Sequence, residues 1–129
     1  MRSFAGSDVA VAVTGASGYI GRRVVARLLE RGTTVVAISR TGEAGRFRDL
    51  RTGREGTLSE LMTGTQALVH LAGRLVDDVA APVAAYLEPN VVLTDHALAA
   101  AVEHHLDVVV HASSRLVYPS DLTSPAVED

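Results

Sequence analysis

The chain has 129 residues, 47% of them hydrophobic and 21% charged, and we expect one globular domain over residues 1–129. Its net charge of −3 disfavours a nucleic-acid partner, because phosphate binding needs a basic face. The lack of cysteine excludes disulfides and thiolate metal sites; we expect a cytoplasmic protein without a metal. No segment approaches the roughly 18 apolar residues that span a bilayer, so no membrane partner is expected.

Short apolar runs alternate with stretches of helical periodicity. In chain order, the expected elements are a strand at 9–14, a helix at 19–31, a strand at 33–39, a short strand near 47–50, a short helix at 58–62, a strand at 66–72, a mainly helical stretch at 83–105 and a strand at 106–112. The four longer strands are apolar and expected to be buried. Pro89 is expected to break the last helix or to start a new first turn.

Buried strands that alternate with helices imply parallel β–α–β units joined by right-handed crossovers. The predicted fold class is therefore α/β, a doubly wound, Rossmann-like parallel sheet of about five strands. We expect the strand order 3-2-1-4-5, with the first strand central.

A glycine-rich loop, Gly15–Gly21, follows the first strand and opens the first helix. Gly15 allows a tight turn, Gly18 lets a pyrophosphate approach backbone amides, and Gly21 lets the helix pack closely on the strand. The helix N-terminus adds unpaired donors and a partial positive charge. The loop predicts a dinucleotide site; the alternative is a structural turn that binds nothing.

The second strand ends with Ser39 and Arg40, about 20 residues past the loop, where dinucleotide folds read the ribose. An acidic residue there would bind both ribose hydroxyls of NAD. Serine and arginine instead suit a 2′-phosphate, so NADP is favoured over NAD. The alternative for Arg40 is a solvated loop arginine.

Several motifs occur in a fixed order: TGASGYIG at 14–21, DL at 49–50, HLAG at 70–73, NVVLT at 90–94, ASSRLVY at 112–118 and SPAVED at 124–129. Together they resemble the NAD-dependent epimerase/dehydratase group of the extended short-chain dehydrogenase/reductase family. The resemblance covers nearly the whole chain, from about Val9 onward.

The loop, the second strand and the resemblance together give a candidate site. The candidate cofactor-binding residues are Gly15, Ser17, Gly18, Tyr19, Ile20, Gly21, Ser39, Arg40, Asp49, Leu50, Leu71, Ala72, Gly73, Asn90 and Ser113. The resemblance implies a partial catalytic role for Ser114, because the matching serine hydrogen-bonds the reacting oxygen; Ser113 and Ser114 also fit small turn-forming residues.

In the resembled family the tyrosine of a Tyr-x-x-x-Lys motif moves the proton. The lysine lowers the pKa of this tyrosine, because a free tyrosine has a pKa near 10, well above the working pH. All twelve basic residues of this chain are arginine, so it contains no lysine. We expect a truncated N-terminal part that lacks this motif and the substrate domain and is inactive on its own.

Two further patterns carry expectations. His70 and His111 lie on apolar strands, and we expect both to be hydrogen-bonded core histidines instead of ligands. The helix over 91–102 is apolar around much of its circumference, which with an unpaired last strand predicts self-association.

Three functions stay open: the cofactor-binding part of a reductase, epimerase or dehydratase, with nucleotide sugars as one substrate class; a non-catalytic NAD(P)-binding sensor; and a structural, oligomerising fragment.

Overall fold

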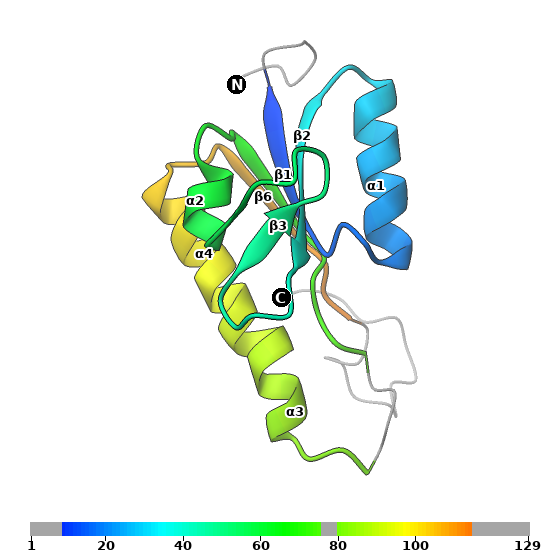
Figure 1. The fold of residues 1–129 in the computed structure, drawn as a ribbon, viewed down its shortest axis with the longest axis vertical. Coiled ribbons are helices and arrows are strands. Elements are labelled where there is room, and N and C mark those ends of the chain that lie inside the picture. The colour runs from blue at the N-terminus through cyan, green and yellow to red at the C-terminus, as the bar shows by residue number, and fades with distance from the viewer. Residues whose placement is uncertain (1–8, 76–79, 115–129) are drawn as a thin grey trace, which may run out of the picture.

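The computed structural model describes residues 9–75 and 80–114, in which helices cover both faces of one six-stranded sheet (Figure 1). The strands are β1 (Ala10–Thr14), β2 (Thr34–Arg40), β3 (Phe47–Asp49), β4 (Glu55–Gly56), β5 (Ala67–His70) and β6 (Val108–His111). The helices are α1 (Tyr19–Glu30), α2 (Leu58–Met62), α3 (Ala84–Leu87), the π-helical turn η1 (Glu88–Val92) and α4 (Leu93–Glu103). The predicted α/β class is confirmed.

The strand order is β4-β3-β2-β1-β5-β6, so the first strand is central, as predicted. The four strands β2, β1, β5 and β6 are parallel, with Val11 opposite Val35 on one side and Ala67 on the other. Their carboxyl ends therefore meet at one edge of the sheet. In doubly wound sheets this edge holds the ligand, beside the strand at which the order reverses.

The edge beyond β2 differs from the prediction of a fully parallel sheet. β3 is antiparallel to β2, and the short β4, which the sequence did not reveal, is antiparallel to β3. The connection over 41–46 explains the difference, because a parallel crossover needs roughly a dozen or more residues. The prediction of parallel pairing is therefore wrong for β3.

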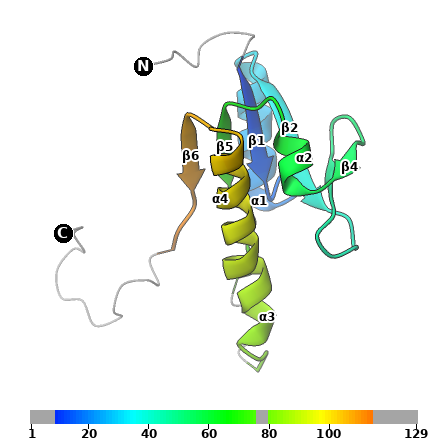
Figure 2. The same cartoon turned by 90° about the vertical axis from the view of Figure 1, so that its left-hand side faces the viewer.

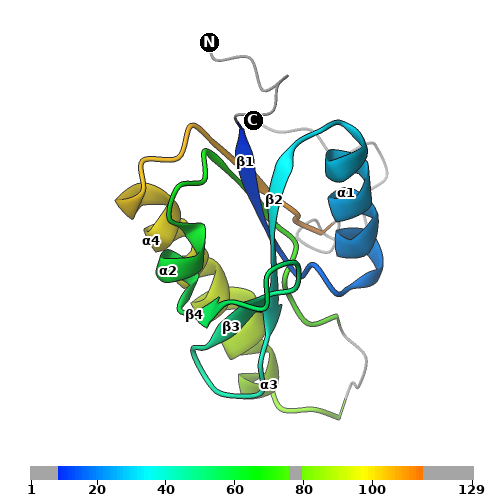
Figure 3. The same ribbon diagram turned by 45° about the horizontal axis from the view of Figure 1, so that its top comes forward.

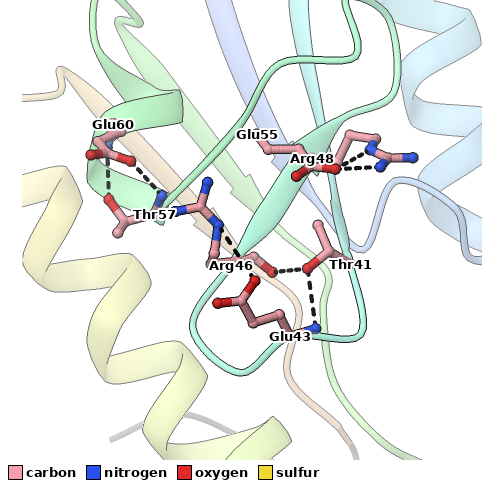
Figure 4. A network of polar contacts seen from close by, with 7 residues as sticks. All are labelled: Thr41, Glu43, Arg46, Arg48, Glu55, Thr57 and Glu60. Atoms are coloured by element: carbon pink, nitrogen blue, oxygen red, sulfur yellow. Dashed lines mark hydrogen bonds and ion pairs between the residues drawn. The ribbon is translucent and has the colours of Figure 1, made fainter.

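Polar contacts hold this antiparallel ribbon in shape (Figure 4). The Thr41 hydroxyl donates to the carbonyl of Arg46 at 3.1 Å and accepts from the amide of Glu43 at 3.2 Å. Arg48 of β3 forms an ion pair with Glu55 of β4. These bonds close the loop between β2 and β3 and join the two short strands.

Helix α2 begins at a capping box. The Thr57 hydroxyl accepts from the amide of Glu60 at 3.2 Å, and the Glu60 carboxylate accepts from the amide of Thr57 at 2.8 Å (Figure 4). This arrangement satisfies donors at the helix start. It fixes α2 so that Leu58, Leu61 and Met62 are buried against the sheet.

Helix α1 lies on one face of the sheet, and α2 and α4 lie on the other (Figure 3). Each face carries an apolar layer, because successive side chains of a strand point to opposite faces. On the face covered by α2 and α4, the buried core is Ala12, Ile38, Leu58, Leu61, Met62, Leu68, Leu93, Ala97, Ala100 and Ala101. On the face covered by α1, the buried core is Val11, Val13, Ala16, Val35, Ala37 and Ala67. β1 contributes to both layers, as expected of a central strand.

The stretch from α3 to α4 is one continuous helix (Figure 2). Pro89 is expected to break it or start a new turn, but the helix instead widens into η1, where the amide of Leu93 donates to the carbonyl of Glu88. A proline ring clashes with the carbonyl four residues earlier in a regular α-helix. The helix continues past Pro89 through this π-helical turn, which contains the proline in its first positions.

β6 forms the edge of the sheet opposite β4 (Figure 2), and all four of its residues are exposed. The predictions of a buried last strand and of a core position for His111 are therefore wrong. Within the described ranges, β6 packs mainly against β5, and no helix covers it. In the same part of the chain, no helix is both long and apolar enough to cross a membrane.

Candidate functional site

A cleft of about 260 Å³ opens at the carboxyl ends of β1, β2 and β5. Its lining residues are Thr14, Gly15, Ser17, Gly18, Ile38, Ser39, Arg40, Phe47, Leu71, Ala72, Gly73 and Leu93. Eight predicted site residues are thus brought together: Gly15, Ser17, Gly18, Ser39, Arg40, Leu71, Ala72 and Gly73. The cleft lies where the sheet order reverses around β1.

Backbone contacts explain two of the loop glycines. Gly15 has a φ of +66°, and a Cβ there would lie 2.8 Å from the amide nitrogen of Ala72. A Cβ on Gly21 would lie 1.9 Å from the carbonyl oxygen of Gly15. Gly21 allows a close approach of α1, but the neighbour is the loop backbone at Gly15 and Ala16 and not, as expected, the strand.

The N-terminus of α1 borders the cleft at Gly18. Gly18 is the N-cap, no side chain caps the helix, and its first turn carries no acidic residue. The first amides of a helix lack intrahelical partners and carry a partial positive charge, so this end favours an anion. Tyr19 and Ile20 are exposed and do not line the cleft; the Arg23 guanidinium lies 3.8 Å from the centre of the Tyr19 ring.

The end of β2 supplies polar groups to the other side of the loop. The hydroxyls of Ser17 and Ser39 are 3.1 Å apart. Arg40 donates to the Glu88 carboxylate of η1 at 3.0 Å, and both side chains are more than half exposed. A second hollow of about 660 Å³ adjoins the cleft and shares Arg40 and Gly73 with it. Arg40 is thus an exposed but paired arginine at the junction of the two hollows.

A buried hydrogen-bond network lies behind the cleft wall. Nδ1 of His70 is 2.7 Å from the hydroxyl of Thr14, and Nε2 is 2.9 Å from the hydroxyl of Thr94. His70 is therefore the hydrogen-bonded core histidine that the sequence predicts. Burial lowers the pKa of His70, and the nearby His111, whose ring stacks on it at 5.5 Å, lowers that pKa further.

Asn90 of η1 holds the loop that leaves β5. Its side-chain oxygen accepts from the amide of Arg74 at 2.7 Å, and its side-chain nitrogen donates to the carbonyl of Arg74 at 3.0 Å. A Cβ on Gly73 would lie 2.9 Å from the same oxygen. Asn90 therefore shapes the cleft wall from outside the lining.

Asp49 is buried at the end of β3 and does not line the cleft. Its Oδ1 accepts from the amides of Ala37 and Arg51, both at 3.1 Å, and its Oδ2 accepts from the Thr52 hydroxyl at 2.8 Å. Asp49 thus ties β2 to the turn that follows β3. Leu50 is exposed beside it and lies outside the lining as well.

Ser113 and Ser114 follow β6, are exposed, and do not line the cleft. The remaining motif residues at 115–118 and 124–129 lie outside the described residues. Among the residues that are described, no cluster of three histidine or acidic side chains could hold a metal ion.

The sequence did not single out Thr14, Ile38, Phe47 and Leu93 as site residues. Thr14 carries the only usable signal, a polar residue at the end of an apolar strand and directly before the glycine loop. Ile38, Phe47 and Leu93 reach the cleft only through the packing of the sheet against α4 and the β3 ribbon.

Comparison with known proteins places this geometry in a family. The chain matches the model of the NAD dependent epimerase/dehydratase family over residues 11–129. It is 29% identical over 130 residues to UDP-glucose 4-epimerase of Halalkalibacterium halodurans, covering 93% of this chain and 39% of that one. It is 34% identical over 114 residues to 4-hydroxy-2-methyl-3-oxo-4-farnesyl-3,4-dihydroquinoline-1-oxide ketoreductase of Stigmatella aurantiaca, covering 81% of this chain and 33% of that one.

A solved structure agrees with this result. MoeE5 in complex with UDP-glucose and NAD superposes with a TM-score of 0.69 and 31% identity, covering 84% of this chain and 38% of that one. The chain therefore spans less than half the length of each of these relatives.

Proposed function

Because this chain belongs to the NAD-dependent epimerase/dehydratase family, we propose that it binds a nicotinamide dinucleotide in the cleft at the carboxyl ends of β1, β2 and β5. The observation that carries the proposal is the junction of β1 and α1, where a glycine loop and an uncapped helix N-terminus border the cleft. The linked phosphates would lie against the backbone over Gly15–Gly21.

The residues present fit this group. Ser17 and Ser39 would hold the adenosine ribose and Arg40 a phosphate on its 2′ position, while the wall over 71–73 would border the nicotinamide half. Hydride transfer is the chemistry that such a cofactor supplies when bound. The other predicted contacts, which lie outside the lining, stay predictions: Tyr19, Ile20, Gly21, Asp49, Leu50, Asn90, Ser113 and the partial catalytic residue Ser114.

We further propose that NADP binds more tightly than NAD. Among the described residues that line the cleft, Arg40 is the only cationic one and none is acidic. A 2′-phosphate would take the guanidinium of Arg40 from Glu88, because arginine pairs with phosphate through a two-pronged set of hydrogen bonds.

Calorimetric titration with NADP and with NAD tests both statements. Arg40→Ala should weaken NADP binding by about tenfold and leave NAD binding nearly unchanged, since only NADP carries the 2′-phosphate. Arg27→Ala is the matched control, because Arg27 also forms an exposed 3.0 Å ion pair, with Glu30, on α1 away from the cleft lining. Equal loss for both nucleotides would contradict the preference, and the absence of binding to either would contradict the function.

For a protein of its relatives' full length, we propose hydride transfer in a reductase, epimerase or dehydratase, with nucleotide sugars as a substrate class. UDP-glucose is bound in MoeE5, and one relative is a UDP-glucose 4-epimerase. Residues 1–129 contain no lysine, and we expect them to bind the cofactor without turning over a substrate. Two other candidates are a non-catalytic sensor and a structural fragment. Nucleotide binding separates them, because a sensor binds the dinucleotide and a structural fragment does not. Self-association and a cytoplasmic location stay predictions.

A further inference from the structure

His70 of β5 is a buried titratable side chain that does not itself line the cleft; it is 1% exposed. It bonds to β1 through Thr14 and to α4 through Thr94, and Thr14 is a cleft residue. His70 thus joins the strand that leads into the glycine loop to the helix on the other side of the site.

The hydrogen bonds fix which ring nitrogen carries the proton. The hydroxyl of Thr94 donates to the carbonyl of Asn90 at 3.0 Å, so it can only accept from His70. Nε2 of His70 therefore carries the hydrogen, and Nδ1 is an acceptor. The hydroxyl of Thr14 then donates to Nδ1.

The same hydroxyl of Thr14 also holds the cleft wall. It accepts from the amides of Leu71 at 3.1 Å and Ala72 at 3.3 Å, so both of its lone pairs are used. The peptide between Leu71 and Ala72 packs closely against Gly15: a Cβ on Gly15 would lie 2.9 Å from the carbonyl carbon of Leu71. The orientation of Thr14 therefore sets how the wall meets the glycine loop.

Protonation of His70 would break this arrangement. A hydrogen on Nδ1 would point at a Thr14 oxygen that already accepts twice, and the hydrogen of Thr14 would lose its acceptor. The described elements around His70 offer no buried negative charge that would stabilise its protonated form. β1 brings no charged residue, β6 brings His111, and the charged or titratable residues of α4 are exposed: Asp95, His96 and Glu103.

We propose that His70 is a positioning residue for nucleotide binding: as the neutral Nε2–H tautomer it orients Thr14 and the Leu71–Ala72 wall, so that nucleotide affinity falls when His70 is protonated. This inference rests on the proposed function, because it concerns the same cleft. The lowered pKa of His70 agrees with it, since the charged form is the one that the site disfavours.

The test follows the dissociation constant of NAD from pH 8 to pH 5. NAD is the probe because a 2′-phosphate would itself titrate near pH 6. Affinity should be constant above the ordinary histidine pKa of about 6.5 and should then fall, by up to about tenfold per pH unit once the pH is below the pKa of His70. His70→Gln should bind more weakly at pH 8 and lose the pH dependence, whereas His96→Gln, on the exposed side of α4, should behave like the wild type.

A second variant and a spectroscopic signal distinguish the loss of this hydrogen bond from a general folding defect. Thr94→Val removes the acceptor for Nε2–H but leaves His70 and the cleft lining intact. It should weaken NAD binding several-fold, with far-ultraviolet circular dichroism unchanged. In the wild type, nitrogen-15 shifts of the imidazole should show the Nε2–H tautomer.

The outcomes separate this inference from the function on which it rests. An Nδ1–H tautomer, or NAD affinity that stays constant while the imidazole signals show His70 titrating, would overturn the inference and leave the function standing. Binding of neither NAD nor NADP at any pH would overturn both.

Discussion

Gly21 and Gly32 are glycines for different physical reasons. In α1, a Cβ on Gly21 would lie 1.9 Å from the carbonyl oxygen of Gly15, so an added methyl group must displace the loop. Gly32 follows the helix with a φ of +76°, and a Cβ there would have no heavy atom within 4 Å. Of the two glycines, only Gly21 contacts the loop that borders the cleft.

Alanine at these two positions should therefore separate stability from binding. Gly21→Ala should cost about 1–3 kcal/mol of unfolding free energy through overpacking and should also abolish most nucleotide affinity. Gly32→Ala should cost about 1 kcal/mol, from left-handed backbone strain, and should bind as the wild type does. Urea unfolding and calorimetry on both variants measure the two effects. Wild-type affinity in Gly21→Ala would contradict the placement of the phosphates at this loop.

Single residues are predictable where the reason is local. The glycine spacing shows where the chain turns and where the helix must approach closely, because both lie within seven residues of sequence at 15–21. The partners of His70 are out of reach, since Thr14 is 56 positions away and Thr94 is 24. The apolar strand around His111 predicts a core position, yet the exposure of an edge strand depends on its neighbours rather than on its own composition.

At the scale of elements, a segment is predictable when its sequence carries an apolar pattern. The four parallel strands follow from apolar runs and the helices α1 and α4 from helical periodicity, and the short elements β3 and α2 are found where they are expected. β4 has only two residues and no pattern to detect. The turn at Pro89 shows a different limit. Proline signals that a regular α-helix cannot continue unchanged, but a break and a π-helical turn both satisfy that condition.

The outer face of α4 carries a prediction of self-association. Leu93, Ala97, Ala100 and Ala101 face the core, whereas the apolar side chains of Leu98 and Val102 are exposed. The edge strand β6, which follows α4 in the chain, adds three exposed valines, Val108, Val109 and Val110. Apolar surface of this kind, together with an open strand edge, favours contact between copies.

Sedimentation equilibrium should therefore show reversible association of the wild-type chain. Val102→Glu should shift the equilibrium toward the monomer, because it places a charge on the exposed face of α4. Val83→Glu is the matched control: the two valines are 74% and 75% exposed, but Val83 precedes α3. A wild-type chain that stays monomeric over the whole concentration range would contradict the prediction.

At the scale of the whole molecule, the order of the parallel strands and the place of the cleft follow from topology. Right-handed crossovers leave few arrangements for alternating strands and helices, and the central first strand then places the loop over 15–21 at the reversal of the order. The full lining of the cleft does not follow from topology. Phe47 reaches it from an antiparallel ribbon and Leu93 from a helix on the other side, so both depend on tertiary packing.

The most direct test of dinucleotide binding is a titration of the nitrogen-15-labelled chain with NADP, followed through its backbone amide signals. The amides over 15–21 and 71–73 should shift together with increasing nucleotide, while those of the short strand β4 should stay in place. Unchanged signals at saturating nucleotide, or shifts confined to α4 and β6, would contradict the proposal that this cleft binds a dinucleotide.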